Sequence, residues 1–184
     1  TIEDLTVLRN EPMSQHTSLC VGGPADLFVR PGSVKALATA IRITKDSDTP
    51  IFALGQGTNV VVRDGGIRGV VLEIGHNLSK IWREGRQVTA QAGVRIAALC
   101  KQCCEWHLTG LEFAAGIPGS VGGALVMNAG AYEGEIANVV QEVLAFDSGG
   151  ECHHLQREEL NLGYRKSIFQ KNDMLIAQAT FSMK

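Results

Sequence analysis

Apolar positions that recur at helical spacing predict two helices. The first extends from Ser33, which can cap its N-terminus, to about Lys45. Its apolar face consists of Val34, Leu37, Ala38 and Ile41. The second extends from Arg95 to His107. Its apolar face consists of Ile96, Leu99, Cys100, Cys103 and Trp106.

Short apolar or alternating runs predict the strands, at 26–29, 51–54, 60–63, 69–74, 80–83, 87–92, 139–146, 151–155 and 175–182. The run at 51–54 is entirely apolar, so we expect a buried strand there. Asp64-Gly-Gly66 predicts a hairpin-type turn between the third and fourth strands.

Short strands mixed with two or three helices predict an α+β fold in two lobes. Residues 1–20 have mixed polarity and are interpreted as an N-terminal arm. The remainder, 21–184, then divides into lobe one at about 21–75 and lobe two at about 76–184.

Composition narrows the class of protein. The 184 residues are 45% hydrophobic and 20% charged, with a net charge of −2 and no run of like charges. Nucleic-acid and membrane-surface binding both need a basic footprint, so neither is expected. No apolar run approaches the roughly 20 residues that cross a membrane, and no signal-peptide pattern is present. We therefore expect a cytoplasmic location.

Three of the five cysteines cluster on the second predicted helix. Cys100, Cys103, Cys104 and His107 have the spacing i, i+3, i+4 and i+7, and such ligands could bind zinc. The same face carries Ile96, however, and free cysteine packs as a small hydrophobe. The other Cys and His residues, at 152–154, are adjacent in a predicted strand. We expect core packing and no metal.

Glycine is the one excess in the composition, with 21 residues concentrated at 55–75 and 110–134. The segment 110–132 has two interpretations. Small side chains let the backbone lie against a flat or charged ligand, and a glycine-rich turn at a helix start leaves N–H groups for an anion. Alternatively, the glycines serve only a tight turn and close helix packing. Composition alone leaves both open.

The segment Leu54-Gly-Gln-Gly-Thr-Asn59 differs from a Rossmann phosphate turn, because the third glycine is missing and a strand is expected next. Its backbone N–H groups, Thr58 and Asn59 suit a pyrophosphate, although an ordinary turn would look the same. Arg165 presents a permanently charged fork of donors that could hold a carboxylate or stabilise an enolate. It could equally be a surface arginine.

The motifs are more specific together than apart. In chain order they are Gly22-Gly-Pro-Ala-Asp26, Leu54-Gly-Gln-Gly-Thr-Asn-Val-Val-Val-Arg-Asp64, Gly116-Ile-Pro-Gly-Ser-Val-Gly-Gly-Ala124, Asn128-Ala-Gly-Ala-Tyr132 and Gly163-Tyr-Arg-Lys-Ser-Ile-Phe169. From about residue 13 onward, the chain resembles the FAD-binding domain of UDP-N-acetylenolpyruvoylglucosamine reductases. These flavoproteins are of the vanillyl-alcohol-oxidase type. The resemblance implies an extended FAD between a small α/β first lobe and a larger second lobe with an antiparallel sheet.

The resemblance also implies roles for particular residues. The pyrophosphate would lie against Gly55, Gly57, Thr58 and Asn59. The rest of the cofactor would lie along Gly116, Ile117, Pro118, Gly119, Ser120, Gly122 and Gly123, with Ile176 near it. Position 123 would lie by the flavin N5 edge, where glycine replaces the serine of some members. The substrate region would include Asn128, Gly130, Ala131, Tyr132 and Tyr164, with Arg165 as the active-site arginine.

The reaction implied by the resemblance belongs to bacterial peptidoglycan synthesis. NADPH would reduce FAD, and the reduced flavin would convert UDP-N-acetylglucosamine enolpyruvate to UDP-N-acetylmuramate. Members take a serine and a glutamate from a C-terminal domain whose motifs are absent here. We therefore expect an FAD-binding portion with poor turnover alone. The alternatives are the FAD subunit of another oxidoreductase, such as a molybdenum hydroxylase, which the motif at 164–167 disfavours, and a non-catalytic nucleotide-binding or interaction module.

Overall fold

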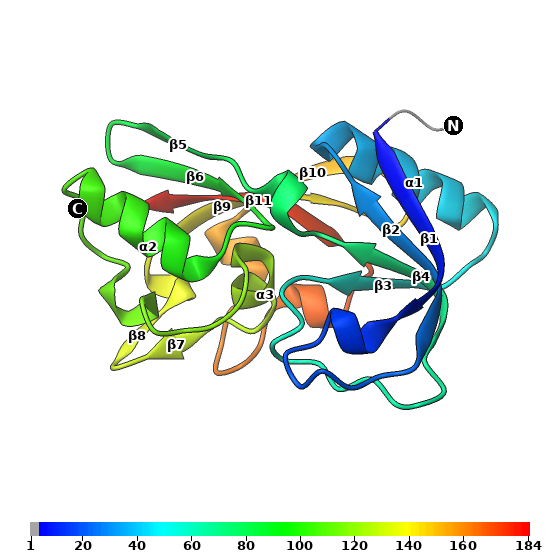
Figure 1. Cartoon of the computed structure of the whole chain (residues 1–184). Coiled ribbons are helices and arrows are strands. Elements are labelled where there is room, and N and C mark those ends of the chain that lie inside the picture. Colours follow the sequence, from blue (N-terminus) through cyan, green and yellow to red (C-terminus); the bar gives the residue numbers. More distant parts are fainter. Residues whose placement is uncertain (1–3) are drawn as a thin grey trace.

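The computed structural model describes residues 4–184, which form two sheets side by side (Figure 1). The first sheet has the strand order β1-β2-β4-β3. Its strands are β1 (Leu5–Pro12), β2 (Pro24–Pro31), β3 (Ile51–Leu54) and β4 (Ile67–Glu73). Strands β2, β4 and β3 are parallel, and β1 is antiparallel to β2. This sheet is the core of the smaller lobe.

Helix α1 (Val34–Asp46) connects β2 to β3, and it is the first predicted helix. Ser33 Oγ accepts a hydrogen bond from the N–H of Ala36 at 3.1 Å, which confirms the predicted cap. The buried residues of the helix are Ala36, Leu37, Ala40, Ile41 and Thr44. Leu37 and Ile41 were predicted to be buried. The buried face is completed by Ala36 and Ala40, whereas the prediction had placed Val34 and Ala38 on it.

The N-terminal segment is not an arm. Strand β1 pairs with β2 from Leu5 opposite Pro31 to Pro12 opposite Pro24. Its polarity is mixed because it is an edge strand, with most of its residues exposed. The turn that follows it, from Met13 to Thr17, is buried at both ends. The segment is therefore part of the first lobe.

The predicted strand at 60–63 and the hairpin after it are wrong. Strands β3 and β4 are parallel neighbours, so the chain between them must cross over instead of turning back. Residues 55–66 form that irregular connection. Its last part is fastened to the sheet by the hydrogen bond from Gly23 N to Arg63 O, at 3.0 Å. Val62 is buried, and Val61 is 70% exposed.

The second sheet has the strand order β10-β9-β11-β6-β5 and is entirely antiparallel. Its strands are β5 (Ile81–Glu84), β6 (Gln87–Gln91), β9 (Val140–Phe146), β10 (Cys152–Gln156) and β11 (Leu175–Ser182). Helices α2 (Ile96–Glu105) and α3 (Val121–Val126) lie beside it, as does the small hairpin of β7 (Gly130–Ala131) and β8 (Gly134–Glu135). The predicted α+β fold, with an antiparallel second sheet, is confirmed.

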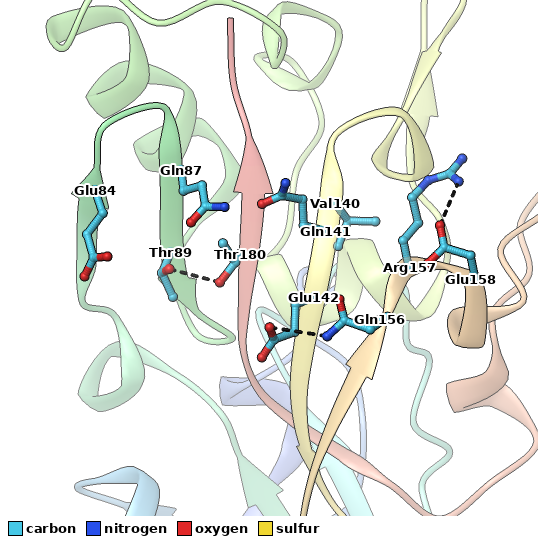
Figure 2. Close-up of a pocket in the computed structure, with 10 residues that line it drawn as sticks. All are labelled: Glu84, Gln87, Thr89, Val140, Gln141, Glu142, Gln156, Arg157, Glu158 and Thr180. Carbon is cyan, nitrogen blue, oxygen red and sulfur yellow. Dashed lines mark hydrogen bonds and ion pairs between the residues drawn. The ribbon is translucent and has the colours of Figure 1, made fainter.

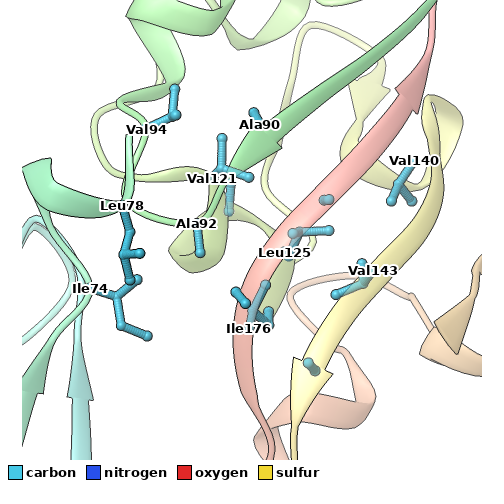
Figure 3. Close-up of a cluster of buried hydrophobic side chains, with 14 of the residues drawn as sticks. Ile74, Leu78, Ala90, Ala92, Val94, Val121, Leu125, Val140, Val143 and Ile176 are labelled. Carbon is cyan, nitrogen blue, oxygen red and sulfur yellow. The ribbon is translucent and has the colours of Figure 1, made fainter. Parts of the chain in front are cut away.

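One face of the second sheet meets α3 and forms the main core (Figure 3). Val121 and Leu125 of α3 pack with Ala90, Val143 and Ile176 of the strands. Strand alternation puts polar side chains on the other face, where Thr89 and Thr180 share a hydrogen bond of 3.0 Å. The first lobe has its own smaller cluster of buried residues: Met13, Ala25, Phe28, Leu54, Val62 and Val71.

The cysteine cluster packs as predicted for a core. Cys103 is buried, and burial raises the pKa of its thiol to about 11. Cys100 is half-buried and donates to Leu111 O at 3.4 Å, whereas Cys104 and His107 are exposed. Residues 4–184 contain no group of three or more His, Cys, Asp or Glu side chains that could hold a metal ion. No helix in the same range is long and apolar enough to cross a membrane.

Candidate functional site

A cleft of about 1050 Å³ is lined by both lobes. One side consists of β3 and the residues after it, to Val60. The other side consists of residues 117–129 and of the segment 165–176. Twelve of the residues predicted to bind the cofactor or to act in catalysis line it: Gly55, Gly57, Thr58, Asn59, Ile117, Pro118, Gly119, Ser120, Gly122, Gly123, Arg165 and Ile176. Gly116 is the one predicted cofactor residue outside this lining.

Strand β3 is an edge strand beside the cleft and is not buried as predicted. Ile51 is half-buried and Ala53 is exposed, and both line the cleft. The run is apolar because it faces a hollow at the edge of the sheet, where a flat ligand could cover it. Sequence reasoning missed these two residues as site residues. The signal was an apolar run that leads directly into Gly55-Gln-Gly57.

The loop after β3 presents free N–H groups. Within residues 4–184, the N–H groups of residues 56–60 donate to no protein acceptor, and Thr58 and Asn59 are exposed. Gly57 has a φ of +63°, and a Cβ there would lie 2.0 Å from the carbonyl oxygen of His16. Only glycine allows this approach. The loop can therefore surround an anion with backbone donors.

The opposite wall contains α3, and its N–H groups are not free. Val121 N donates to Val94 O at 2.8 Å, and Gly122 N donates to Ala92 O at 2.9 Å. Gly123 N and Ala124 N donate to the side chain and the carbonyl of Ser120. The N–H groups of Val121, Gly122 and Gly123 are among those that a helix start normally leaves unpaired, whereas the bond from Ala124 is the first one within the helix. Within residues 4–184, the N–H groups of Gly119 and Ser120 donate to no protein acceptor. The second sheet and Ser120 thus satisfy three of the expected donors, and anion binding by the remaining two stays a prediction.

The two walls approach each other at Gly119. Its φ is +126°, and a Cβ there would lie 3.2 Å from Thr58 Oγ1. The wall from Ile117 to Gly123 is thus a flat surface of backbone and small side chains that faces the donor loop. Ile176, which is buried on β11, closes the cleft behind it.

Arg165 lies on a tight turn at the edge of the cleft. Gly163 and Lys166 exchange two backbone hydrogen bonds of 3.0 Å, and Arg165 between them has a φ of +52°. Gln170 Nε2 donates to Arg165 O at 3.0 Å. The guanidinium forms no ion pair or hydrogen bond with any described residue. An arginine held in a left-handed turn without a carboxylate partner is available to an anionic ligand.

The predicted substrate residues do not line the cleft. Asn128 is 2% exposed, and its amide is fully used: Nδ2 donates to Gly163 O and Oδ1 accepts from Ala137 N, both at 3.0 Å. The structure therefore gives Asn128 another role, that of fixing the base of the Arg165 turn. Gly130 and Ala131 form β7. Tyr132 and Tyr164 are 93% and 94% exposed, so their substrate contacts stay predictions.

A second hollow, of about 500 Å³, lies on the polar face of the second sheet (Figure 2). Its one arginine, Arg157, is already engaged by Ala137 O at 2.7 Å and by Glu158 at 3.8 Å. A hydrogen bond from His154 holds the pKa of Glu142 below its ordinary value. This hollow has no glycine-rich wall, so the cleft is the candidate site.

Comparison with known proteins identifies the family. A family described as the FAD binding domain matches residues 25–156, which is more than half of the chain. The chain belongs to this FAD-binding domain family. Its cofactor is FAD, as the resemblance implied.

The relatives share one name. UDP-N-acetylenolpyruvoylglucosamine reductases of Geobacillus kaustophilus and Clostridium novyi are 46% and 47% identical over 97% of this chain. The chain spans 58% of the length of these relatives. The crystal structure of the Thermus caldophilus reductase has a TM-score of 0.82 at 29% identity, with 98% of this chain and 62% of that chain covered. The predicted resemblance is confirmed.

The fold itself is more widely distributed. A solvent-stable cholesterol oxidase matches 97% of this FAD-binding chain and 38% of its own, with a TM-score of 0.75 at 18% identity. Such a likeness shows the fold alone. It supports the predicted two-lobed architecture.

The residues present fit FAD. The cleft is at the upper end of the range of about 300–1,000 Å³ that is usual for ligand pockets. Its glycines form a wall that side chains would fill, as at Gly119, and the loop opposite offers donors for a pyrophosphate. Side chains such as Ile117 and Ile176 provide the apolar contacts that a flat ring needs.

Proposed function

We propose that this chain is the FAD-binding portion of a cytoplasmic UDP-N-acetylenolpyruvoylglucosamine reductase. The reaction is the NADPH-dependent reduction of UDP-N-acetylglucosamine enolpyruvate to UDP-N-acetylmuramate, for peptidoglycan synthesis. The observation that carries the proposal is the identity of 46% along 97% of the chain to proteins of that name. The cholesterol oxidase, at 18% identity, shares only the fold.

The loop at 55–59 is proposed to hold the FAD pyrophosphate. The free N–H groups from residue 56 onward, the Thr58 hydroxyl and the Asn59 amide would donate to it. Neutral donors that converge on one anion act as a positively polarised nest. FAD, when bound, supplies a two-electron carrier that the nicotinamide donor and the unsaturated substrate use in turn.

The wall from Gly116 to Gly123 is proposed to orient the rest of the cofactor and to exclude water from it. The N–H groups of Val121, Gly122 and Gly123 are bonded within the protein, so beyond the N–H groups of Gly119 and Ser120 this wall contributes shape and apolar contact. Gly123 is exposed to the cleft and has no side chain that could donate to the flavin. Ile176 supports the same surface from β11.

Arg165 is proposed as the catalytic residue of this chain. Reduction of an enolpyruvyl double bond builds negative charge toward the substrate carboxylate. A fixed cation beside that carboxylate stabilises the charge as it develops. Arg165 has the required properties, since it lies at the cleft and forms no internal ion pair among the described residues. Gly130, Ala131, Tyr132 and Tyr164 are proposed to contact the UDP-sugar from the same end.

The test begins with flavin uptake by the purified chain, followed by NADPH oxidation with and without the enolpyruvyl substrate. We expect bound FAD absorbance and slow turnover, because the chain spans 58% of the length of its reductase relatives and the resemblance places two further catalytic groups in their remaining portion. Arg165→Met should retain FAD and lower the substrate-dependent rate about 100-fold. A colourless chain that takes up no FAD would contradict the proposal. Full-rate turnover would contradict the assignment as a portion.

A further inference from the structure

The turn from Met13 to Ser18 lies directly behind the donor loop. Ser18 N donates to Gly57 O at 3.0 Å, and the carbonyl oxygen of His16 lies where a Gly57 side chain would start. Thr17, which is 6% exposed, fixes the next bend through its hydroxyl, which donates to Val21 O at 2.8 Å. The position of the donor loop therefore depends on the position of this turn.

The His16 side chain fastens the turn to the first sheet. It is 8% exposed and stacks on Phe28 of β2, with ring centroids 4.1 Å apart. Its Nε2 lies 2.9 Å from Glu11 Oε1 on β1. Its Nδ1 lies 4.0 Å from Glu73 Oε1 at the end of β4. One imidazole thus contacts residues of three strands.

The carboxylates around His16 are themselves held in place. Glu73 pairs with Arg30 at 2.5 Å, and the Arg30 guanidinium lies over the Phe28 ring at 5.1 Å. Glu11 and Glu73 are each 18% exposed at the side chain. A half-buried network of this kind defines a unique geometry when all of its members are paired. None of these side chains lines the cleft, so the network can act on a ligand only through the turn.

We infer that His16 is a positioning residue for the pyrophosphate-binding loop. It clamps the turn 13–18 onto the first sheet and so holds Gly57, and with it the N–H groups after it, in the geometry that receives the phosphates. The inference rests on the proposed placement of the pyrophosphate at 55–59. Outer-shell residues of this kind typically change ligand affinity about 10- to 100-fold when they are removed.

The test compares His16→Leu with His16→Gln, whose amide can replace Nε2 as the partner of Glu11. The matched control is His154→Leu. It removes the histidine from another histidine–carboxylate pair, that of His154 with Glu142 on the outer face of the second sheet. We expect FAD to bind about tenfold or more weakly to His16→Leu, close to normally to His16→Gln, and normally to the control. Hydrogen exchange should rise in the peptide that covers 13–20, whose Ser18 N–H donates to Gly57 O, and stay unchanged in the peptide that covers 116–126.

The outcomes separate the inference from the proposed function. Normal FAD binding by both His16 variants would overturn the inference alone. Equal acceleration of exchange in both peptides of His16→Leu would also overturn it, since the residue would then support the whole fold. Failure of the unsubstituted chain to bind FAD would overturn the proposed function and the inference with it.

Discussion

Two glycine-rich segments face each other across the cleft, and they use glycine differently. In the loop at 55–60, glycine allows the backbone to turn so that its N–H groups stay unpaired. In the segment at 116–123, the N–H groups of the α3 residues are bonded within the protein, and among the described residues of the cleft wall only Gly119 and Ser120 keep unpaired N–H groups. The first segment supplies a run of donors, and the second supplies a surface with donors only at the start of its helix.

The difference follows from what lies behind each segment. Behind the wall is β6 with its extension, whose carbonyls at Ala92 and Val94 accept the N–H groups of α3. Behind the loop is the turn at 13–18, which offers Ser18 N to Gly57 O and so contributes a donor, not an acceptor. Both segments are rich in glycine. The partner behind the backbone decides how many N–H groups each segment leaves for an anion.

The largest effect is expected from Gly57→Ala. The substitution forces a side chain into a left-handed conformation, with its Cβ 2.0 Å from His16 O. Strain of about 1–3 kcal/mol, together with displacement of the loop, should weaken FAD binding by about two orders of magnitude. Flavin fluorescence titration measures the effect.

The control for Gly57→Ala lies in the same connection. A Cβ at Gly65 would meet nothing within 4 Å, so Gly65→Ala should bind FAD normally. If both variants lost FAD equally, FAD binding would depend on the flexibility of the whole connection from 55 to 66 and not on the donor geometry at Gly57. The loop could then no longer be distinguished from the wall as the source of donors.

Gly122→Val and Gly123→Ala separate the two sides of the wall. A Cβ at Gly122 would lie 3.1 Å from that of Ala92, so a larger side chain should push α3 from the sheet. We expect the free energy of unfolding to fall by about 1–3 kcal/mol. Gly123 faces the cleft. Alanine there should leave stability unchanged or raise it by about 0.5–1 kcal/mol, and should still weaken FAD binding.

Denaturant unfolding and FAD titration of the same two variants give the answer. A normal melting point for Gly122→Val, combined with poor FAD binding, would mean that this position faces the cofactor. The wall would then have no protein-facing side. Reduced stability of Gly123→Ala would likewise contradict the orientation of α3.

Much of this arrangement was predictable from sequence because it is local. Helical spacing located α1, and eleven of the twelve predicted cofactor residues line the cleft. The predictions that failed depend on distant partners. Whether the Gly122 N–H is free depends on Ala92 O, thirty positions earlier, and no local pattern records that bond.

Topology explains the remaining errors. A parallel pairing of β3 with β4 requires a crossover, but Asp64-Gly-Gly66 looks locally like a hairpin. Asn128 has a residue type suited to substrate binding, yet a buried amide bonds to whichever backbone groups surround it, here Gly163 and Ala137. The role of His16 depends on contacts with three strands, so no single motif contains it.

The smallest expected effect concerns a region away from both glycine segments. Glu142 accepts a hydrogen bond from His154 on the outer sheet face, and this bond holds the pKa of Glu142 below its ordinary value of 4.5. A carboxyl whose pKa is lower in the folded state stabilises the fold above its unfolded pKa. That contribution is lost as the pH falls through the lowered folded value. Because the pair is exposed, we expect only a few tenths of a kcal/mol.

Glu142→Gln isolates this contribution. The difference in unfolding free energy between the unsubstituted chain and Glu142→Gln should shrink as the pH falls below about 4, where Glu142 becomes protonated in the folded chain. FAD affinity should be equal in the two proteins throughout, because Glu142 is far from the cleft lining. If the difference in unfolding free energy increased as the pH fell, the folded state would bind the Glu142 proton more tightly than the unfolded state does. Altered FAD affinity of Glu142→Gln would mean that the outer face of the second sheet influences the cleft. The loop and the wall alone would then not account for FAD binding.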